Sequence, residues 1–278
     1  MNKPIKRVAV IHDLCILGKA ALTNIVPILS VSGLEVCPIP TLTLSTHTGG
    51  FGTPAIQNMN NFFCELINHY KSLDIKFNGI FIGYLGNEDN LHNSINFIRN
   101  FGYKNNIPIL FDPICGDDGK LYSNFDNSYV DNIRTFIKFA NIITPNYTEA
   151  CLLSKNQYKN KISDNEIYRI CIELASLGAK TIIITSVPVN EDKLGVAVYD
   201  SEQNKFKLIV HNKEIYSYPG TGDIFSSILF SNIVNKKDIF ESVKSSINFT
   251  RNCIIESSKY DYPRREGVLL EKFLKDLI

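Results

Sequence analysis

The stretch Ile107-Pro108-Ile109-Leu110-Phe111-Asp112-Pro113 decides the fold, because a short apolar run ends abruptly at an aspartate. The same pattern returns twice further along the chain: Ile142–Thr144 runs into Pro145-Asn146, and Thr181–Thr185 runs into Ser186. Such runs are typical of buried parallel strands, and in an open parallel sheet ligands collect outside the carboxyl ends of the strands. The polar strand ends therefore predict where a site is assembled.

Helix-length segments separate the short apolar runs, and this alternation is the pattern of parallel βαβ units. Val196–Tyr199 and Phe206–Val210, with a polar turn between them, predict an antiparallel hairpin at the sheet edge. We therefore predict an α/β chain: a central, mostly parallel sheet flanked by helices, with an antiparallel edge hairpin. Because no linker or repeat interrupts it, residues 1–278 are expected to form a single domain. The other predicted strands are Val8–Ile11, Val36–Leu44 and Gly79–Tyr84, and the predicted helices are Leu22–Ser32, Met59–Leu73, Leu91–Phe101, Thr221–Val234 and Asp238–Glu256.

Composition excludes several classes of protein. With 29 Lys plus Arg against 28 Asp plus Glu, the net charge is +1, so no global field favours nucleic acid or an anionic membrane as a partner. Seven scattered cysteines without a C-x-x-C pair argue against a disulfide framework or zinc ribbon and favour the reducing cytoplasm. The charge-free stretch Val36–Cys64 is broken by prolines and glycines, so it is a candidate pocket wall rather than a bilayer helix.

The stretch Pro219-Gly220-Thr221-Gly222-Asp223 leads directly into a predicted helix. Its glycines allow a tight turn, and the unpaired amides at a helix N-terminus form an anion hole that favours phosphate. Asp223 is placed to take a proton from an attacking hydroxyl while these amides stabilise a transferred phosphoryl group. For so short a motif, a plain helix start with an acidic residue in its first turn is the commoner explanation.

Two familiar nucleotide motifs are missing. The two Gly-Lys pairs are followed by Ala20 and Leu121 rather than by Ser or Thr, so no Walker A loop is present. After Gly220 and Gly222, the third position of a dinucleotide fingerprint is Phe225 rather than glycine. A P-loop NTPase and a Rossmann dehydrogenase are therefore both disfavoured.

Two carboxylates lie close to the ends of predicted strands. Asp112 precedes a loop rich in glycine and aspartate. A solvated turn would also explain the composition of this loop. Glu149 follows Asn146 and Thr148, either of which could cap a short helix with Glu149 in its first turn. Alternatively, Asp112 and Glu149 act near metal-bound phosphates, because Mg²⁺ takes carboxylate oxygens directly or through water.

Three segments, in this order and spacing, resemble the ribokinase superfamily and, within it, the pyridoxal kinase family. They are FDPICGDDGKLY at 111–122, TPNYTEACLL at 144–153 and PGTGDIF at 219–225. Residues 83–86 are similar to the family's Gly-Tyr-Leu-Gly strand end, and residues 45–52 to its His-Thr loop. The similarity runs from about Val8 to the final helices, and the motifs together are far more specific than any one of them.

The resemblance implies an ATP-dependent kinase that phosphorylates the hydroxymethyl group of pyridoxal, pyridoxamine or pyridoxine, and it implies a homodimer. Asp223 would contact and activate that hydroxyl, and the amides of Gly220, Thr221 and Gly222 would form the anion hole. Mg²⁺ would lie near Asp112 and Glu149, whereas the use of a monovalent cation is left open. The residues expected to bind ATP are Asp112, Thr144, Glu149, Thr185, Ser186 and Gly222.

The substrate ring would lie against His47, Thr48 and Tyr84, since an aromatic face and hydroxyl donors suit a substituted pyridine. Near the end of the first strand the family commonly places a serine that touches the ring, but His12-Asp13 stands here. Asp13 or His12 would replace that serine, and a carboxylate there favours a protonated pyridine nitrogen or an amine. A purely structural role for His12 is an equal alternative.

Other functions remain open at this stage. A hydroxymethylpyrimidine kinase of thiamine synthesis also acts on a small heteroaromatic alcohol, although the segments at 45–52 and 116–122 favour the pyridoxal kinases. A relative that only binds a vitamer or nucleotide is a second alternative, against which the intact Asp223 and its glycines count. A nucleotide-dependent oxidoreductase is the third, and the absent fingerprint weakens it.

Overall fold

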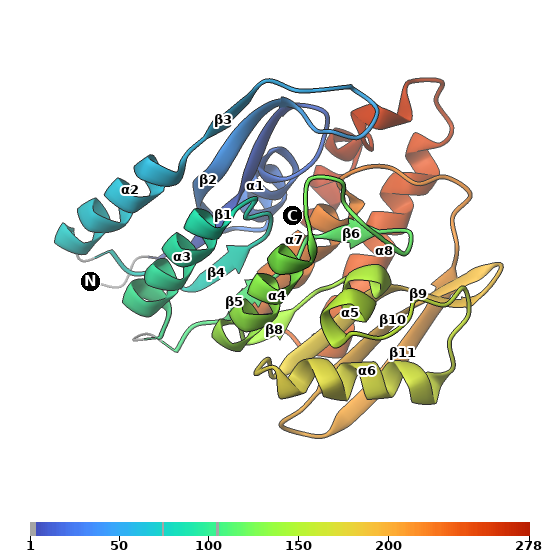
Figure 1. Cartoon of the computed structure of the whole chain (residues 1–278). Helices are drawn as coiled ribbons and strands as arrows, with labels where there is room; N and C mark the ends of the chain where they lie inside the picture. Colours follow the sequence, from blue (N-terminus) through green and yellow to red (C-terminus); the bar gives the residue numbers. More distant parts are fainter. Residues whose placement is uncertain (1–3, 74, 104–105) are drawn as a thin grey trace. The chain divides into compact units, whose positions relative to one another are not determined.

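The computed structural model describes residues 4–73, 75–103 and 106–278 (Figure 1). The chain divides into two units: unit 1 contains Met1–Pro108 and Glu214–Ile278, and unit 2 contains Ile109–Lys213. Each unit contains both helices and strands, and each is described by itself below. The α/β class predicted from the sequence is confirmed, whereas a single domain over residues 1–278 stays a prediction.

Unit 1 is built on β1 (Arg7–Leu17), which pairs in parallel with β2 (Glu35–Thr46) and with β4 (Gly79–Ile82). The short strand β3 (Ile56–Asn58) adds to β2 in antiparallel orientation. Residues 8–11 of β1 are completely buried, which is why they form a continuous apolar run without alternation. The predicted strand was too short, because pairing with β2 continues beyond a register shift between His12 and Leu14.

Helices cover both faces of the unit 1 strands, with α2 (Asn60–Ser72) and α3 (Glu88–Phe97) on one face (Figure 1). The other face carries α1 (Leu22–Val31), α7 (Thr221–Val234) and α8 (Ile239–Ser257). The last helix was predicted almost exactly, and α7 was predicted exactly. Among the described residues, no helix has the length and apolarity needed to cross a bilayer.

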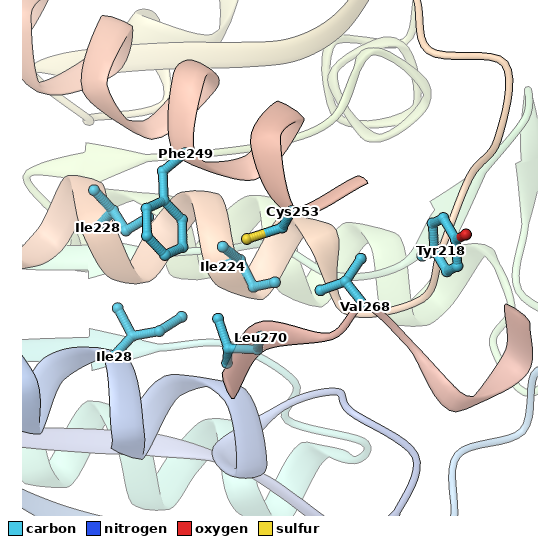
Figure 2. Close-up of a cluster of buried hydrophobic side chains, with 8 residues drawn as sticks. All are labelled: Ile28, Tyr218, Ile224, Ile228, Phe249, Cys253, Val268 and Leu270. Atoms are coloured by element: carbon cyan, nitrogen blue, oxygen red, sulfur yellow. The ribbon is translucent and has the colours of Figure 1, made fainter. Parts of the chain in front are cut away.

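A cluster of buried apolar side chains holds α7 in place (Figure 2). Ile224 and Ile228 of α7 meet Ile28 of α1, Phe249 of α8 and Leu270 near the C-terminus. Truncating one of these isoleucines to alanine would cost about 2–5 kcal/mol, because the surrounding side chains cannot fill the space. The N-terminus of α7, which carries Asp223, is therefore fixed by packing.

Unit 2 contains the strands β5 (Ile109–Phe111), β8 (Ile142–Ile143) and β9 (Thr181–Asn190), which pair in parallel in that order. The predicted antiparallel edge hairpin is confirmed: β10 (Lys193–Asp200) pairs with β9 and with β11 (Lys205–Asn212). The remaining elements are the hairpin β6 (Gly116–Asp117) and β7 (Lys120–Leu121), and the helices α4 (Asn127–Phe136), α5 (Tyr147–Ser154) and α6 (Asp164–Ser176).

The predicted end of the β9 strand at Ser186 is wrong. β9 continues to Asn190, and in its pairing with β10 the two residues Thr185 and Ser186 lie opposite the single residue Val196. Ser186 has a φ of 56°, the mark of a bulge that bends the strand without ending it. The amide of Thr185 donates to the carbonyl of Pro145 at 3.0 Å, so Thr185 lies beside the end of β8.

The predicted helix Leu91–Phe101 is wrong at both ends. The helix α3 begins at Glu88 because the side chain of Asn87 accepts a hydrogen bond from the amide of Asn90 and caps it. After Phe97 the chain continues as a π-helical turn, Ile98–Gly102. The hydrophobic pattern located the buried face of this helix but not its ends.

Candidate active site

Gly220 begins α7 in a left-handed conformation, with a φ of 78°. A Cβ at this position would lie 2.1 Å from the carbonyl oxygen of Lys19 and 2.5 Å from Nδ2 of Asn24, so only glycine fits. Asn24 Nδ2 donates to the carbonyls of both Gly220, at 3.2 Å, and Lys19, at 2.9 Å. The turn before α7 is therefore held against residues 19–24, which connect β1 to α1 and form its first turn.

The space beside the first turn of α7 is open. A Cβ added at Gly222 would meet no heavy atom within 4 Å, and Gly222 itself is exposed. The hydroxyl of Thr221 donates back to the carbonyl of Tyr218 at 3.1 Å, which tightens the turn. Helix N-terminal amides beside open space are the arrangement that an anion site needs, and anion binding itself stays a prediction.

Asp223 lies in the first turn of α7 and is only 8% exposed. Its Oδ2 accepts a hydrogen bond from the amide of Ala21 at 2.6 Å, and its Oδ1 lies 3.3 Å from Nε2 of His12. Ala21 has a φ of 58° and a ψ of −139°, a conformation that costs a residue with a side chain about 1–3 kcal/mol. The amide of Ala21, a residue in a strained backbone conformation, thus fixes the orientation of the Asp223 carboxylate. A catalytic base has to be held in this way.

His12 lies between two carboxylates and is 2% exposed. Its Nδ1 is 2.7 Å from Oδ1 of Asp13, and its Nε2 faces Asp223. Burial alone would lower the pKa of His12, but the hydrogen bonds and charges of Asp13 and Asp223 outweigh burial and raise it to about 10. Asp13, the predicted ring contact, is therefore already engaged by a buried histidine.

The His-Thr loop is tied to the C-terminal segment of unit 1. His47 Nε2 donates to the carbonyl of Arg265 at 2.6 Å, while its Nδ1 accepts from the amide of Gly49 at 3.1 Å. Arg265 in turn donates to the carbonyl of Gly50 at 3.0 Å. Thr48 is exposed, and both ring nitrogens of His47 hold the loop. The predicted contacts of His47 and Thr48 with a substrate ring stay predictions.

The third predicted ring contact, Tyr84, follows β4 and is half-buried. Its carbonyl accepts a hydrogen bond from the hydroxyl of Thr41 at 2.9 Å, which ties the end of β4 to β2 across the intervening strand β1. The backbone of Tyr84 is thus fixed in unit 1, and its contact with a substrate ring is also still a prediction.

In unit 2, the two carboxylate motifs are joined by hydrogen bonds. Asn146 and Glu149 form a capping box at the start of α5, so Asn146, not Thr148, is the cap. Glu149 Oε1 also accepts from the amide of Cys115 at 3.0 Å, and Asn146 Nδ2 donates to the carbonyl of Gly116 at 2.8 Å. The start of α5 therefore holds the loop that follows Asp112.

Asp112 and Glu149 are both buried, at 6% and 3% exposed. Burial and then the charge of Asp112 raise the pKa of Glu149, whereas backbone amides of Asn146, Cys115 and Gly116 lower it. No cluster of three or more metal-ligating side chains occurs in the described ranges. Two repelling hard-oxygen donors nevertheless fit Mg²⁺, which proteins commonly hold through one or two carboxylates together with substrate phosphates.

Two further residues of unit 2 complete this region. Thr144 is buried directly after β8, and its amide donates to the carbonyl of Phe111 at 3.0 Å. Cys115 is buried, and burial raises the pKa of its thiol, so it is a packing residue rather than a nucleophile. Its backbone amide, and not its sulfur, contributes to the region.

The predicted site residues divide between the two units. Within unit 1, the ring of His12 lies between Asp13 and Asp223, and within unit 2, α5 brings Glu149 to the loop after Asp112. Neither Ala21 nor Asn24 was indicated by a sequence motif, because they contact the Asp223 turn across 202 and 196 residues. Unit 1 holds Asp13, His47, Thr48, Tyr84, Gly220, Thr221, Gly222 and Asp223, and unit 2 holds Asp112, Thr144, Glu149, Thr185 and Ser186.

Comparison with known proteins shows which family the chain resembles. The family model for phosphomethylpyrimidine kinase matches residues 28–265. A pyridoxal kinase of Arabidopsis thaliana is 26% identical over 243 residues, which cover 85% of this chain and 77% of that protein.

Two solved structures resemble the chain along almost its whole length. One is a Bacteroides thetaiotaomicron protein, provisionally assigned as a phosphomethylpyrimidine kinase and crystallised with pyridoxal. It is 34% identical with a TM-score of 0.93, covering 98% of this chain and 96% of that one. The other, pyridoxal kinase from Lactobacillus plantarum, is 25% identical with a TM-score of 0.89, covering 99% and 97%.

These similarities bear out the resemblance that the motifs carried. The family model spans most of the chain, and the Bacteroides thetaiotaomicron protein is similar over nearly all of it. The predicted ribokinase-like fold, the kinase class and the similarity to pyridoxal kinases are confirmed. The chain therefore belongs to the phosphomethylpyrimidine kinase family, within the ribokinase-like superfamily.

Proposed function

We propose that this chain is a pyridoxal kinase that transfers the γ-phosphoryl group of ATP to the hydroxymethyl group of a B6 vitamer. The observation that carries the proposal is Asp223, a buried carboxylate held by Ala21 and His12 at the start of a helix with open space beside it. Relatives named pyridoxal kinase, and one crystallised with pyridoxal, support the choice of substrate.

The chain's own groups supply positioning and charge stabilisation. Asp223 takes the proton of the substrate hydroxyl as its oxygen attacks the γ-phosphorus, and the bond from phosphorus to the leaving ADP oxygen breaks. The amides of Gly220, Thr221 and Gly222 stabilise the negative charge on the transferred group. Because these groups are fixed before the substrate arrives, little reorganisation is needed in the transition state.

Asp112 and Glu149 would hold Mg²⁺, and bound Mg²⁺ neutralises phosphate charge. Both carboxylates are buried, and the charge of Asp112 disfavours ionisation of Glu149. A bound cation would offset the cost of burying these negative charges and their repulsion, which supports the assignment. Thr144, Thr185 and Ser186 are proposed to contact ATP, and Asp13, His47, Thr48 and Tyr84 the vitamer. We also propose that the protein is a homodimer and is cytoplasmic. Light scattering of the purified chain tests whether it is a dimer.

A panel assay tests the proposed function. Purified protein with MgATP is incubated with pyridoxal, pyridoxamine, pyridoxine, hydroxymethylpyrimidine and a simple sugar, and phosphorylated product is followed. Phosphorylation of at least one B6 vitamer is expected, and exchanging K⁺ for Na⁺ in the same assay tests for a monovalent cation. If no vitamer is phosphorylated, the proposal is wrong.

The role of Asp223 is tested by its amide. Asp223→Asn keeps the size of the side chain and the acceptor for the Ala21 amide but cannot take a proton. It should lower kcat by about two to four orders of magnitude, the range for a lost general base, with an unchanged circular dichroism spectrum. Wild-type turnover in this variant would remove Asp223 from the chemistry.

The name of the matching family model favours one second candidate, a kinase of hydroxymethylpyrimidine or its phosphate. The same panel separates the two functions by the ratio of kcat/KM for the pyrimidine and for the vitamers. A higher value for the pyrimidine would favour this candidate. Vitamer binding without turnover, measured by calorimetry, would instead indicate a relative that only binds.

A further inference from the structure

The protonation of His12 follows from its contacts. Nδ1 of His12 lies 2.7 Å from Oδ1 of Asp13 and 2.9 Å from the backbone nitrogen of Asp13. The shorter contact, to the carboxylate, needs a proton on Nδ1, because an ionised carboxylate has none to give. If Nε2 were bare, its lone pair would face Asp223 Oδ1 at 3.3 Å. A proton on Nε2 removes this conflict, and the raised pKa of His12 agrees with protonation of both ring nitrogens.

The space for the His12 ring exists because residue 83 is a glycine. Gly83 directly follows β4, and a Cβ there would lie 2.0 Å from Cδ2 and 2.2 Å from Nε2 of His12. The ring of Phe81 packs edge-on against His12, with 6.3 Å between ring centroids. The first glycine of the Gly-Tyr-Leu-Gly motif therefore makes space for a buried histidine.

Few charged groups compete for His12. Asp13 is its neighbour on β1, and Asp223 reaches it from α7. Cys15, also on β1, is neutral at physiological pH because burial and the charge of Asp13 raise its pKa to about 11. His12 Nε2 is buried without a well-aligned hydrogen-bond partner among the described residues, so Asp223 is the group that can complete its bonding.

We propose that His12, held by Asp13, is a positioning residue for Asp223: its Nε2 fixes Asp223 Oδ1, and its positive charge stabilises the carboxylate that takes the substrate proton. The inference rests on the proposed function of Asp223 as the base. In this arrangement Ala21 holds one carboxylate oxygen and His12 holds the other. The proton of the substrate hydroxyl goes to Asp223, and His12 keeps both of its own protons throughout.

The first test is His12→Gln, which keeps a donor but removes the charge. Losing a charge-assisted hydrogen bond should lower kcat about 10- to 100-fold, while KM for the vitamer and ATP stays within about threefold. A fall in kcat without a rise in KM is the result that a merely structural role of His12 would not give. A wild-type kcat, or a loss of kcat matched by an equal change in KM, would overturn the proposal.

The second test displaces the ring without changing any charge. Gly83→Ala should lower kcat as His12→Gln does, and combining the two substitutions should lower it no further, since both act through one ring. Gly79→Ala, at the start of β4, is the matched control, because its Cβ would press on Phe230 and Val234 instead of His12. Equal effects of Gly83→Ala and Gly79→Ala on kcat would overturn the proposal.

The third test measures the protonation of His12 directly, first in the wild-type protein, and does not depend on turnover. Nitrogen chemical shifts of the histidine rings should show His12 doubly protonated at about pH 8, and Asp223→Asn should shift its titration to lower pH. A neutral His12 ring at that pH would overturn the proposal. If the protein phosphorylates no vitamer, this result still reports the His12–Asp223 contact, so failure of the proposed function is recognised separately.

Discussion

Replacing Asn146 tests how unit 2 holds the loop after Asp112. The Asn146 side chain makes two hydrogen bonds: Oδ1 accepts from the amide of Glu149 at 2.9 Å, and Nδ2 donates to the carbonyl of Gly116 at 2.8 Å. A lost helix cap costs about 1 kcal/mol, and a lost half-buried hydrogen bond costs about 1 kcal/mol more. Asn146→Ala should therefore lower the free energy of unfolding by about 2 kcal/mol.

Two further variants separate the two bonds. Asn87→Ala is the matched control, because Asn87 is also a half-buried asparagine that caps a helix, and its second hydrogen bond, to the Asn60 side chain, is long at 3.3 Å. It should cost about 1 kcal/mol. Asn146→Asp keeps the cap but loses the donor to Gly116, so it should cost an intermediate amount.

Urea unfolding followed by far-ultraviolet circular dichroism measures these differences, because the chain has no tryptophan to serve as a fluorescent probe. Under the proposed function, KM for MgATP should also rise in both Asn146 variants and not in Asn87→Ala. Equal stability losses in Asn146→Ala and Asn87→Ala would refute the reasoning, since they would mean that the bond to Gly116 contributes nothing.

Three more predictions concern the turn, the pH dependence and the metal. Gly220→Ala should lower the unfolding free energy by more than about 1 kcal/mol and reduce kcat, because a φ of 78° and the Lys19 carbonyl exclude a Cβ; thermal unfolding and turnover measure both. The pKa of His12 is about 10, above its ordinary 6.5, so its stabilisation is complete below pH 6.5 and is lost as pH rises through 10. The stability difference between wild type and His12→Gln should therefore fall by a few kcal/mol over this range in urea titrations. Mg²⁺ should raise the melting temperature of the wild type, and Asp112→Asn should lose this rise in a thermal-shift assay.

Much of the fold followed from local pattern. The exact prediction of α7 came from the glycine turn that begins it and the apolar residues that follow. The buried strand segments were found because parallel strands covered on both faces are continuously apolar. The bulge at Ser186 and the continuation of β1 to Leu17 were missed, because both depend on how a neighbouring strand pairs.

The candidate site shows the same division. Asp223, its glycines, Asp112 and Glu149 could be named as candidates from the sequence because turn chemistry and strand ends are local properties. The clamp by Asn24, the strained amide of Ala21 and the carboxylates on either side of His12 were not, because they join segments about 200 residues apart. His12 was noticed but could not be assigned, since its partner depends on packing.

By itself, the sequence determined an α/β fold with a glycine turn that begins a helix and an aspartate in that helix's first turn. Those features depend on backbone preferences of adjacent residues, which each residue carries wherever it lies. Only the tertiary structure decided what lies against that aspartate: the backbone amide of Ala21 on one oxygen and the buried ring of His12 facing the other. Charge and burial act through space, so neither could be assigned until folding had brought β1 and α7 together.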